Sequence, residues 1–147
     1  MTDQDLIAAF EARTLPTADF SHRRHLRIAW HYLSAAPLGI AAERFKAALQ
    51  RYAAAHGRPH LYHETITWAY LILLNQIRAA LAADAVPVTF ESAMAHCPAL
   101  LHHRGGPLFD YYTQDQLDLP EYRAAFILPT PARAPVPAES RCSARIS

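Results

Sequence analysis

The sequence predicts an all-α protein, a single-domain helical bundle of four main helices followed by short C-terminal helices. Apolar residues recur at helical spacing through long segments that are bounded by capping residues and prolines. Hydrophobic residues make up 52% of the chain and charged residues 18%, with only 4 glycines, a composition typical of packed, ordered proteins. The 147 residues suit one domain with its own core.

The first two helices are predicted from their caps and apolar positions. Thr2 or Asp3 can cap a helix that has Leu6, Ile7 and Phe10 at helical spacing and ends before Pro16. Ser21 is an N-cap candidate for a second helix over residues 22–35, which Pro37 stops.

The third and fourth helices are expected to be the longest. Residues 38–56 form the third, with Gly57 as its left-handed C-cap. Its apolar face is predicted to consist of Ile40, Ala41, Phe45, Ala48, Leu49 and Tyr52. The fourth helix covers residues 62–82, and residues 72–74 are apolar nearly all round. This pattern predicts a helix enclosed by others.

The rest of the chain gives a weaker signal. A short helix is predicted over residues 90–96 with Thr89 as its cap, and a loop over residues 102–107. LFDYYTQDQL and PEYRAAFIL then suggest two short helices, the last with Pro120 in its first turn. The bundle domain therefore spans residues 1–128. Residues 129–147 are rich in Pro, Ala and Arg without periodicity, and are predicted to be a disordered tail.

Charge and hydropathy exclude several classes of partner. The formal net charge is +1 and no run of Lys or Arg occurs, so neither nucleic acid nor an anionic membrane surface is expected as a partner. The N-terminus has acids where a signal peptide has bases, and no apolar run approaches the roughly 18 residues of a membrane span. A cytoplasmic location is predicted. Whether the chain is a monomer or a homodimer stays open.

Two histidine-containing stretches carry the chemistry, FSHRRHLRIAWHYL (20–33) and RPHLYHETITWAYLILL (58–74). His22 and His25, three residues apart, share one helix face, and His63 begins the buried fourth helix beside Glu64. Three imidazoles with a nearby carboxylate are ligands typical of a divalent transition metal, Zn, Fe or Cu, and would leave an open coordination position. Glu64 could be a fourth ligand or a general base.

The two stretches also align with each other at an offset of 38 residues, where both read HxxHxxIxWxYL. One interpretation is a pseudo-twofold pair of helical hairpins, in which His60 matches His22. The alternative is a chance match, because apolar helices draw on few residue types.

Simpler interpretations exist for the same residues. A histidine at a helix end is often only a cap or a surface group, as expected here for His31, His56 and His96. Trp30 is expected in the core, with lining a pocket as the alternative. His22 and His63 instead continue apolar stripes, so they should be partly buried and in need of partners, which a shared metal would supply.

Three segments resemble a known family. FSHRRHLRIAW, YHETIT (62–67) and YRAAFILP (122–129) are similar to small, mostly uncharacterised bacterial helical proteins with FxHxxHxxxAW and YHETxT motifs. The resemblance implies that one site contains His22, His25, Tyr62, His63, Glu64 and Thr67. It implies no activity, and His60 lies outside its pattern.

Three functions follow from these observations. The first is a small metal-dependent enzyme acting on a small-molecule substrate, in which His22, His25 and His63 hold the metal. Glu64 and Tyr62 are then its catalytic residues, and Thr67 and Trp30 contact the substrate; a biosynthetic tailoring step would suit such an enzyme. The second is a metal-free lyase, cyclase or isomerase that uses His and Glu as acid and base. The third is a non-catalytic module that binds a metal or small ligand.

Overall fold

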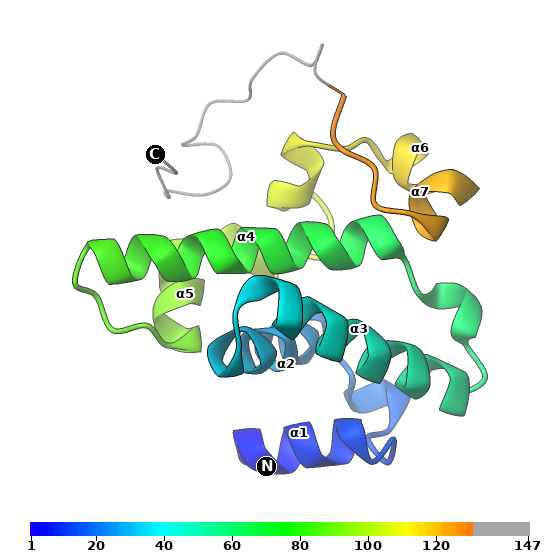
Figure 1. Cartoon of the computed structure of the whole chain (residues 1–147), viewed down its shortest axis with the longest axis horizontal. Coiled ribbons are helices and arrows are strands. Elements are labelled where there is room, and N and C mark those ends of the chain that lie inside the picture. Colours follow the sequence, from blue (N-terminus) through cyan, green and yellow to red (C-terminus); the bar gives the residue numbers. More distant parts are fainter. Residues whose placement is uncertain (131–147) are drawn as a thin grey trace. The chain divides into compact units, whose positions relative to one another are not determined.

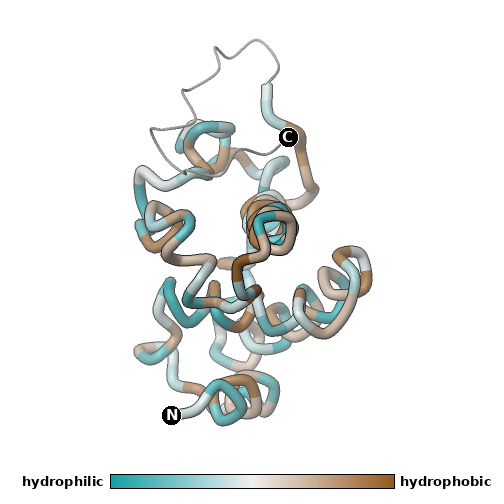
Figure 2. The backbone as a smooth tube through the Cα atoms, turned by 90° about the vertical axis from the view of Figure 1, so that its left-hand side faces the viewer, coloured by the Kyte–Doolittle hydropathy of each residue, from teal (hydrophilic) through white to brown (hydrophobic). Residues whose placement is uncertain are grey.

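The computed structural model describes residues 1–130, and within them every regular element is a helix (Figure 1). This confirms the predicted all-α class. Internal contacts divide the chain into two compact units, residues 1–63 and the residues from Glu64 onward. In Figure 2, brown apolar and teal polar residues share the turns of single helices, as expected of amphipathic helices with one face in a core.

The N-terminal unit contains three α-helices and two short 3₁₀-helices. They are α1 (Asp3–Glu11), η1 (Thr17–Asp19), α2 (His22–Ala35), α3 (Leu38–Ala55) and η2 (Pro59–Leu61). The predicted caps Thr2 and Ser21 are confirmed, since the Thr2 hydroxyl accepts from the N–H of Asp5 and the Ser21 hydroxyl from that of Arg24. The bounds predicted for the first two helices are therefore correct.

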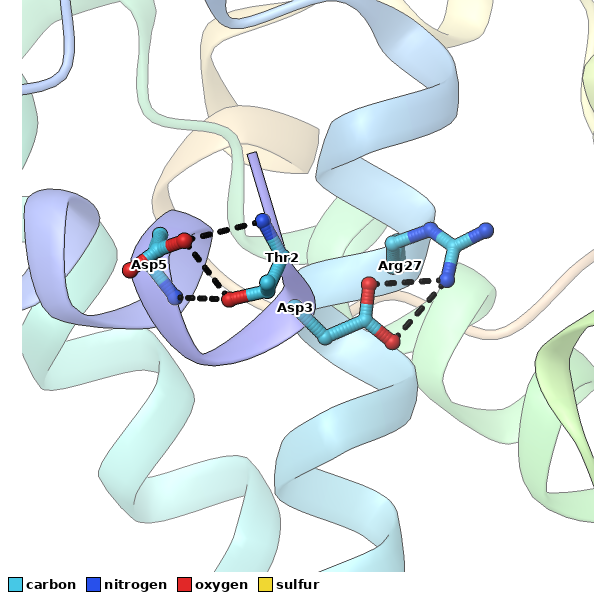
Figure 3. Close-up of polar contacts among 4 residues, drawn as sticks. All are labelled: Thr2, Asp3, Asp5 and Arg27. Atoms are coloured by element: carbon cyan, nitrogen blue, oxygen red, sulfur yellow. Dashed lines mark hydrogen bonds and ion pairs between the residues drawn. The ribbon is translucent and has the colours of Figure 1, made fainter.

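Polar contacts tie α1 to α2 at the surface. Figure 3 shows the capping box of α1, in which the Asp5 carboxylate accepts from the backbone N–H and the hydroxyl of Thr2, at 3.0 and 2.7 Å. In the same view, Arg27 Nη1 of α2 donates to both carboxylate oxygens of Asp3, at 2.8 and 3.0 Å. Asp3 and Asp5 therefore stabilise α1 by their interaction with the positive end of its helix dipole. Asp3 also forms an ion pair with Arg27 of α2.

Aromatic rings form the core of the N-terminal unit. Phe10 of α1 is fully buried, and its ring centroid lies 5.7, 6.3 and 5.3 Å from those of Phe20, Phe45 and Tyr52. The predicted apolar face of α3 is correct except for Ile40, which is 46% exposed. Ala42 is buried in that region instead, because the contact stripe is rotated from the predicted one by a fraction of a turn.

The C-terminal unit consists of one long helix and several short ones. They are α4 (Glu64–Ala83), α5 (Phe90–His96), η3 (Pro98–Leu101), η4 (Pro107–Asp110), α6 (Gln114–Leu117) and α7 (Pro120–Ala124). Thr89 caps α5 as predicted, and Thr113 caps α6. Ala69 of α4 packs in a cluster with Leu108, Tyr112 and Leu117, so the short helices fold against the long one.

The apolar helix α4 differs from its prediction in two ways. It begins at Glu64, so Tyr62 and His63 precede it. Leu71 and Leu74 are buried, but Ile72 and Leu73 between them are only half-buried, so the helix is not enclosed all round. The sequence was expected to contain no segment of membrane-spanning length, but the 20 residues of α4 are long and apolar enough to cross a membrane. Core helices of soluble proteins also meet this criterion of length and composition.

The last described segment is extended rather than helical. The prediction of a helix through Ala125–Leu128 is wrong, because α7 ends at Ala124 and Ala125 has φ −142° and ψ 155°. Pro129 disfavours helical backbone at the residue before it, and side chains of other elements bind this backbone. The predicted disordered tail lies, apart from Pro129 and Thr130, outside the described residues.

The residues that follow α3 and α4 both have a positive φ angle, and one is a glycine and the other an alanine. Gly57 after α3 and Ala85 after α4 both have left-handed backbone, with φ of 70° and 56°, and a Cβ on Gly57 would meet nothing within 4 Å. We expect Gly57→Ala to lower the free energy of unfolding by about 1 kcal/mol and Ala85→Gly to raise it by roughly 0.5–1 kcal/mol. Urea denaturation measures both, and equal signs for the two changes would contradict this account.

Candidate functional site

Ring contacts join the start of α2 to the end of α3. Phe20, just before α2, lies 5.0 Å from His25 and 4.9 Å from Tyr52 near the end of α3. The 3₁₀-helix η2, which follows α3, packs against it. We call this region, residues 20–25, 52–57 and 59–63, the histidine end.

His22 and His25 occupy the first turn of α2, because the Ser21 cap fixes the helix start. Both side chains are half-buried. The His25 ring stacks on Phe20 at an interplanar angle of 26° and lies 5.7 Å from the Phe45 ring at 46°. These ring contacts fix the orientation of the His25 imidazole.

Tyr62 and His63 follow η2 and precede α4. Tyr62 is half-buried, and its backbone N–H donates to the carbonyl of Pro59 at 3.3 Å. His63 is only 6% exposed, one of three polar residues classed as buried among residues 1–130, the others being Thr65 and Thr67. Burial removes water from the imidazole nitrogens, so they need hydrogen-bond partners within the protein.

Glu64 and Thr67 lie on α4, and Trp30 lies on α2. Glu64 is the half-buried first residue of α4, and Thr67 lies buried one turn further along that helix. Trp30 is 6% exposed in the N-terminal unit, about two turns from His22 along α2. That position favours the core interpretation of Trp30 over contact with a substrate.

The proposed pseudo-repeat does not extend to local structure. His22 is the first residue of α2, but His60, aligned with it, lies exposed inside the 3₁₀-helix η2, and α4 begins four residues later. Equivalent sequence positions therefore adopt different backbone conformations, which favours the chance match.

Thr65 has a structural role that the sequence did not reveal. Its fully buried hydroxyl donates to the carbonyl of Ala125 at 2.7 Å and accepts from the N–H of Ile127 at 3.2 Å. The hydroxyl of Tyr112 donates to the carbonyl of Ile127 at 2.6 Å, and burial raises the pKa of Tyr112 to about 12, so it remains a donor. The YHETIT and YRAAFILP segments are thus joined by hydrogen bonds.

Removing the Thr65 hydroxyl should loosen the extended segment. We expect Thr65→Val, which keeps the side-chain shape, to lower the free energy of unfolding by about 1–3 kcal/mol, because two backbone groups lose their partner. Amide exchange at Ile127 should become faster in the same variant. Thr17→Val on the exposed η1 is the control, and unchanged exchange at Ile127 would refute the assigned role.

His56, predicted from the sequence to be only a solvent-facing or helix-terminal residue, also belongs to the histidine end. It is the C-cap residue that follows α3, its ring centroid lies 4.4 Å from that of Tyr52, and its side chain is half-buried. Its Nε2 atom is buried and has no hydrogen-bond partner. Only the folded arrangement reveals this, because the sequence shows a histidine before a glycine and nothing more.

Metal ligation gains no support from the described residues. Within residues 1–130, no three or more His, Cys, Asp and Glu side chains form a group that could hold a metal ion. The imidazoles of His22, His25 and His63 remain suitable donors by chemical type.

The candidate site thus consists of half-buried His22 and His25 in one helical turn, with Tyr62 and buried His63 on the segment that follows the same hairpin. No protein family model, curated protein or solved structure matches the chain.

Proposed function

We propose that the chain is a small enzyme that transfers protons on a small-molecule substrate, as a lyase, cyclase or isomerase does. The observation that supports the proposal is the burial of His63, on the segment that follows the α2–α3 hairpin, together with the contacts of His25 with the Phe20 and Phe45 rings. Histidine titrates near neutral pH, so two imidazoles in different surroundings suit an acid and a base.

The surroundings suggest which histidine has which role. We assign the general acid to His25, whose ring contacts Phe20 and Phe45. We assign the general base to the buried His63. His22 lies one turn from His25 and Tyr62 precedes His63, so both are candidates for contact with the substrate. Glu64, joined to His63 by a peptide bond, is a second candidate base.

A metal-dependent enzyme is the second candidate, because three imidazoles are the donor set of many catalytic metal sites. In that version His22, His25 and His63 hold Zn, Fe or Cu, which would polarise the substrate or a bound water, and Glu64 acts as the base. The resemblance to the helical family with the YHETxT motif supports the shared grouping of these residues, not the choice between the two versions. A cytoplasmic location and a small-molecule partner belong to both.

Deuterium exchange tests the proposal on a mixture of candidate substrates. The purified chain, without a His tag, is incubated in D₂O with small carbonyl compounds and organic acids, and mass spectrometry detects deuterium gain or a changed product. We expect at least one compound to exchange or react at a rate that depends on the protein. Elemental analysis of the same sample distinguishes the versions, since a stoichiometric transition metal would favour the second.

A further inference from the structure

The extended segment after α7 is held by hydrogen bonds along one of its two edges. Side chains of Thr65 and Tyr112 bind the backbone of Ala125 and Ile127. In Figure 1 this segment, in orange, leaves α7 without helical turns. The peptide groups of successive residues in an extended chain point to opposite edges. The backbone N–H and C=O groups of Phe126 and Leu128 therefore point away from the side chains that hold the segment.

This outward edge has no partner in the part of the chain that the structure describes. Among residues 1–130 the backbone groups of Phe126 and Leu128 form no hydrogen bond, and no β-strand is present to pair with them. Phe126 is 36% exposed and Leu128 is 73% exposed. An exposed extended edge of this kind is a template for pairing with another extended chain.

The composition and the anchoring of the segment both favour pairing. Residues 124–130, AAFILPT, contain no charged residue, whereas proteins that keep an edge unpaired commonly place charges on it. The anchors are well fixed, because Thr65 is fully buried and Tyr112 is 2% exposed. The ring centroid of Phe126 also lies 6.2 Å from that of Trp68 on α4. A segment ordered in advance loses little conformational entropy when it pairs.

The arrangement of the outward groups is self-complementary. Phe126 and Leu128 are placed symmetrically on either side of Ile127 in the sequence. In an antiparallel pair with a twofold axis at Ile127, Phe126 of each copy lies opposite Leu128 of the other, and each such pair exchanges both of its N–H···O bonds. Every outward N–H and C=O group of these two residues is then satisfied, and their exposed side chains become cross-strand neighbours. This symmetry selects a second copy of the same chain as the partner.

We infer that the chain forms a homodimer by antiparallel pairing of residues 125–128 with the same residues of a second copy. The inference goes beyond the proposed function and does not depend on it. Pairing cannot extend further, because residue 130 would lie opposite Ala124, which belongs to α7. A contact this short gives a weak, reversible dimer.

Sedimentation equilibrium of the full chain, from micromolar to millimolar concentration, tests the inference without an enzymatic assay. We expect a reversible monomer–dimer equilibrium. Amide hydrogen exchange at Phe126 and Leu128 should slow as the concentration rises, because these N–H groups are bonded only in the dimer. Exchange at Ile127, whose N–H is bonded to Thr65 in each copy, should change little. In a mixture of ¹³C-labelled and unlabelled chains, a nuclear Overhauser effect should connect the Hα atoms of Ile127 in the two copies, since the Cα atoms of a pair without hydrogen bonds lie close together.

Two variants and a control locate the contact. Leu128→Pro removes an outward N–H and should weaken dimerisation roughly 10- to 100-fold, because each copy loses one hydrogen bond to the other. Leu128→Lys keeps the N–H but adds a charge at the edge, and should also weaken dimerisation. Leu119→Lys makes the same change at another leucine of the C-terminal unit, 43% exposed, and should dimerise as the unmodified chain does. Amide exchange at Ile127 reports whether the segment keeps its place in each variant.

Two results would overturn the inference. The first is a chain that stays monomeric at millimolar concentration, which would leave the outward edge to a different extended partner. The second is a dimer that forms as tightly in both Leu128 variants as in the unmodified chain, which would place the contact on another surface.

Discussion

Replacing His63 by Gln is expected to lower turnover of the substrate found by deuterium exchange by roughly 100- to 10,000-fold, the usual contribution of a general acid or base. Gln has a similar length and keeps hydrogen-bonding atoms, but it cannot accept and return a proton near neutral pH. The loss should lie in kcat more than in KM, because proton transfer is a property of the transition state.

An exposed histidine of the N-terminal unit provides the control. His31 is exposed on α2, and His31→Gln should keep turnover within a factor of about two of the unmodified chain, since surface substitutions rarely disturb a fold. Far-ultraviolet circular dichroism and melting temperature should show that both variants are folded. Full turnover by folded His63→Gln would remove His63 from the catalytic machinery.

Phe10→Ala is expected to lower the free energy of unfolding by about 3–5 kcal/mol, the range for truncation of a buried aromatic residue. Phe10 is 0% exposed and contacts Phe20, Phe45 and Tyr52. The cavity would lie among rings of α3 and of the segment before α2, where closely packed side chains fill a void only in part. Urea denaturation at neutral pH measures the loss.

Ile40→Ala is the matched control for that measurement. Ile40 lies on α3, whose core contacts include Phe45, but it is 46% exposed, and its truncation should change the free energy of unfolding by no more than about 0.5 kcal/mol. A loss below about 1 kcal/mol for Phe10→Ala would mean that the ring cluster contributes little to the N-terminal unit.

The helices of the N-terminal unit could be predicted closely from the sequence because their signals are local. Ser21 bonds within its own first turn, and Gly57 has the left-handed backbone expected of a C-cap. The extended segment after α7 could not be predicted in this way. Its conformation depends on Thr65 and Tyr112, which lie 60 and 15 residues from the backbone groups that they bind.

The candidate site could be predicted only in part. Helical spacing correctly placed His22 and His25 in one turn of α2, and the apolar stripe through His63 correctly predicted its burial. Spacing could not reveal that His25 stacks on Phe20, or that His56 has a buried unbonded nitrogen, because both facts depend on the folded positions of the side chains. Whether a metal binds depends on distances between histidines that sequence spacing does not fix.

The central claim, that the histidines of the N-terminal unit transfer protons without a metal, is tested most directly by deuterium exchange with chelated protein. The purified chain is treated with a strong chelator, its metal content is checked by elemental analysis, and its exchange rate on the responding substrate is compared with that of untreated protein. The account predicts the same rate before and after chelation. Loss of exchange on chelation, followed by recovery on addition of Zn²⁺ or Fe²⁺, would contradict it and establish the metal-dependent alternative.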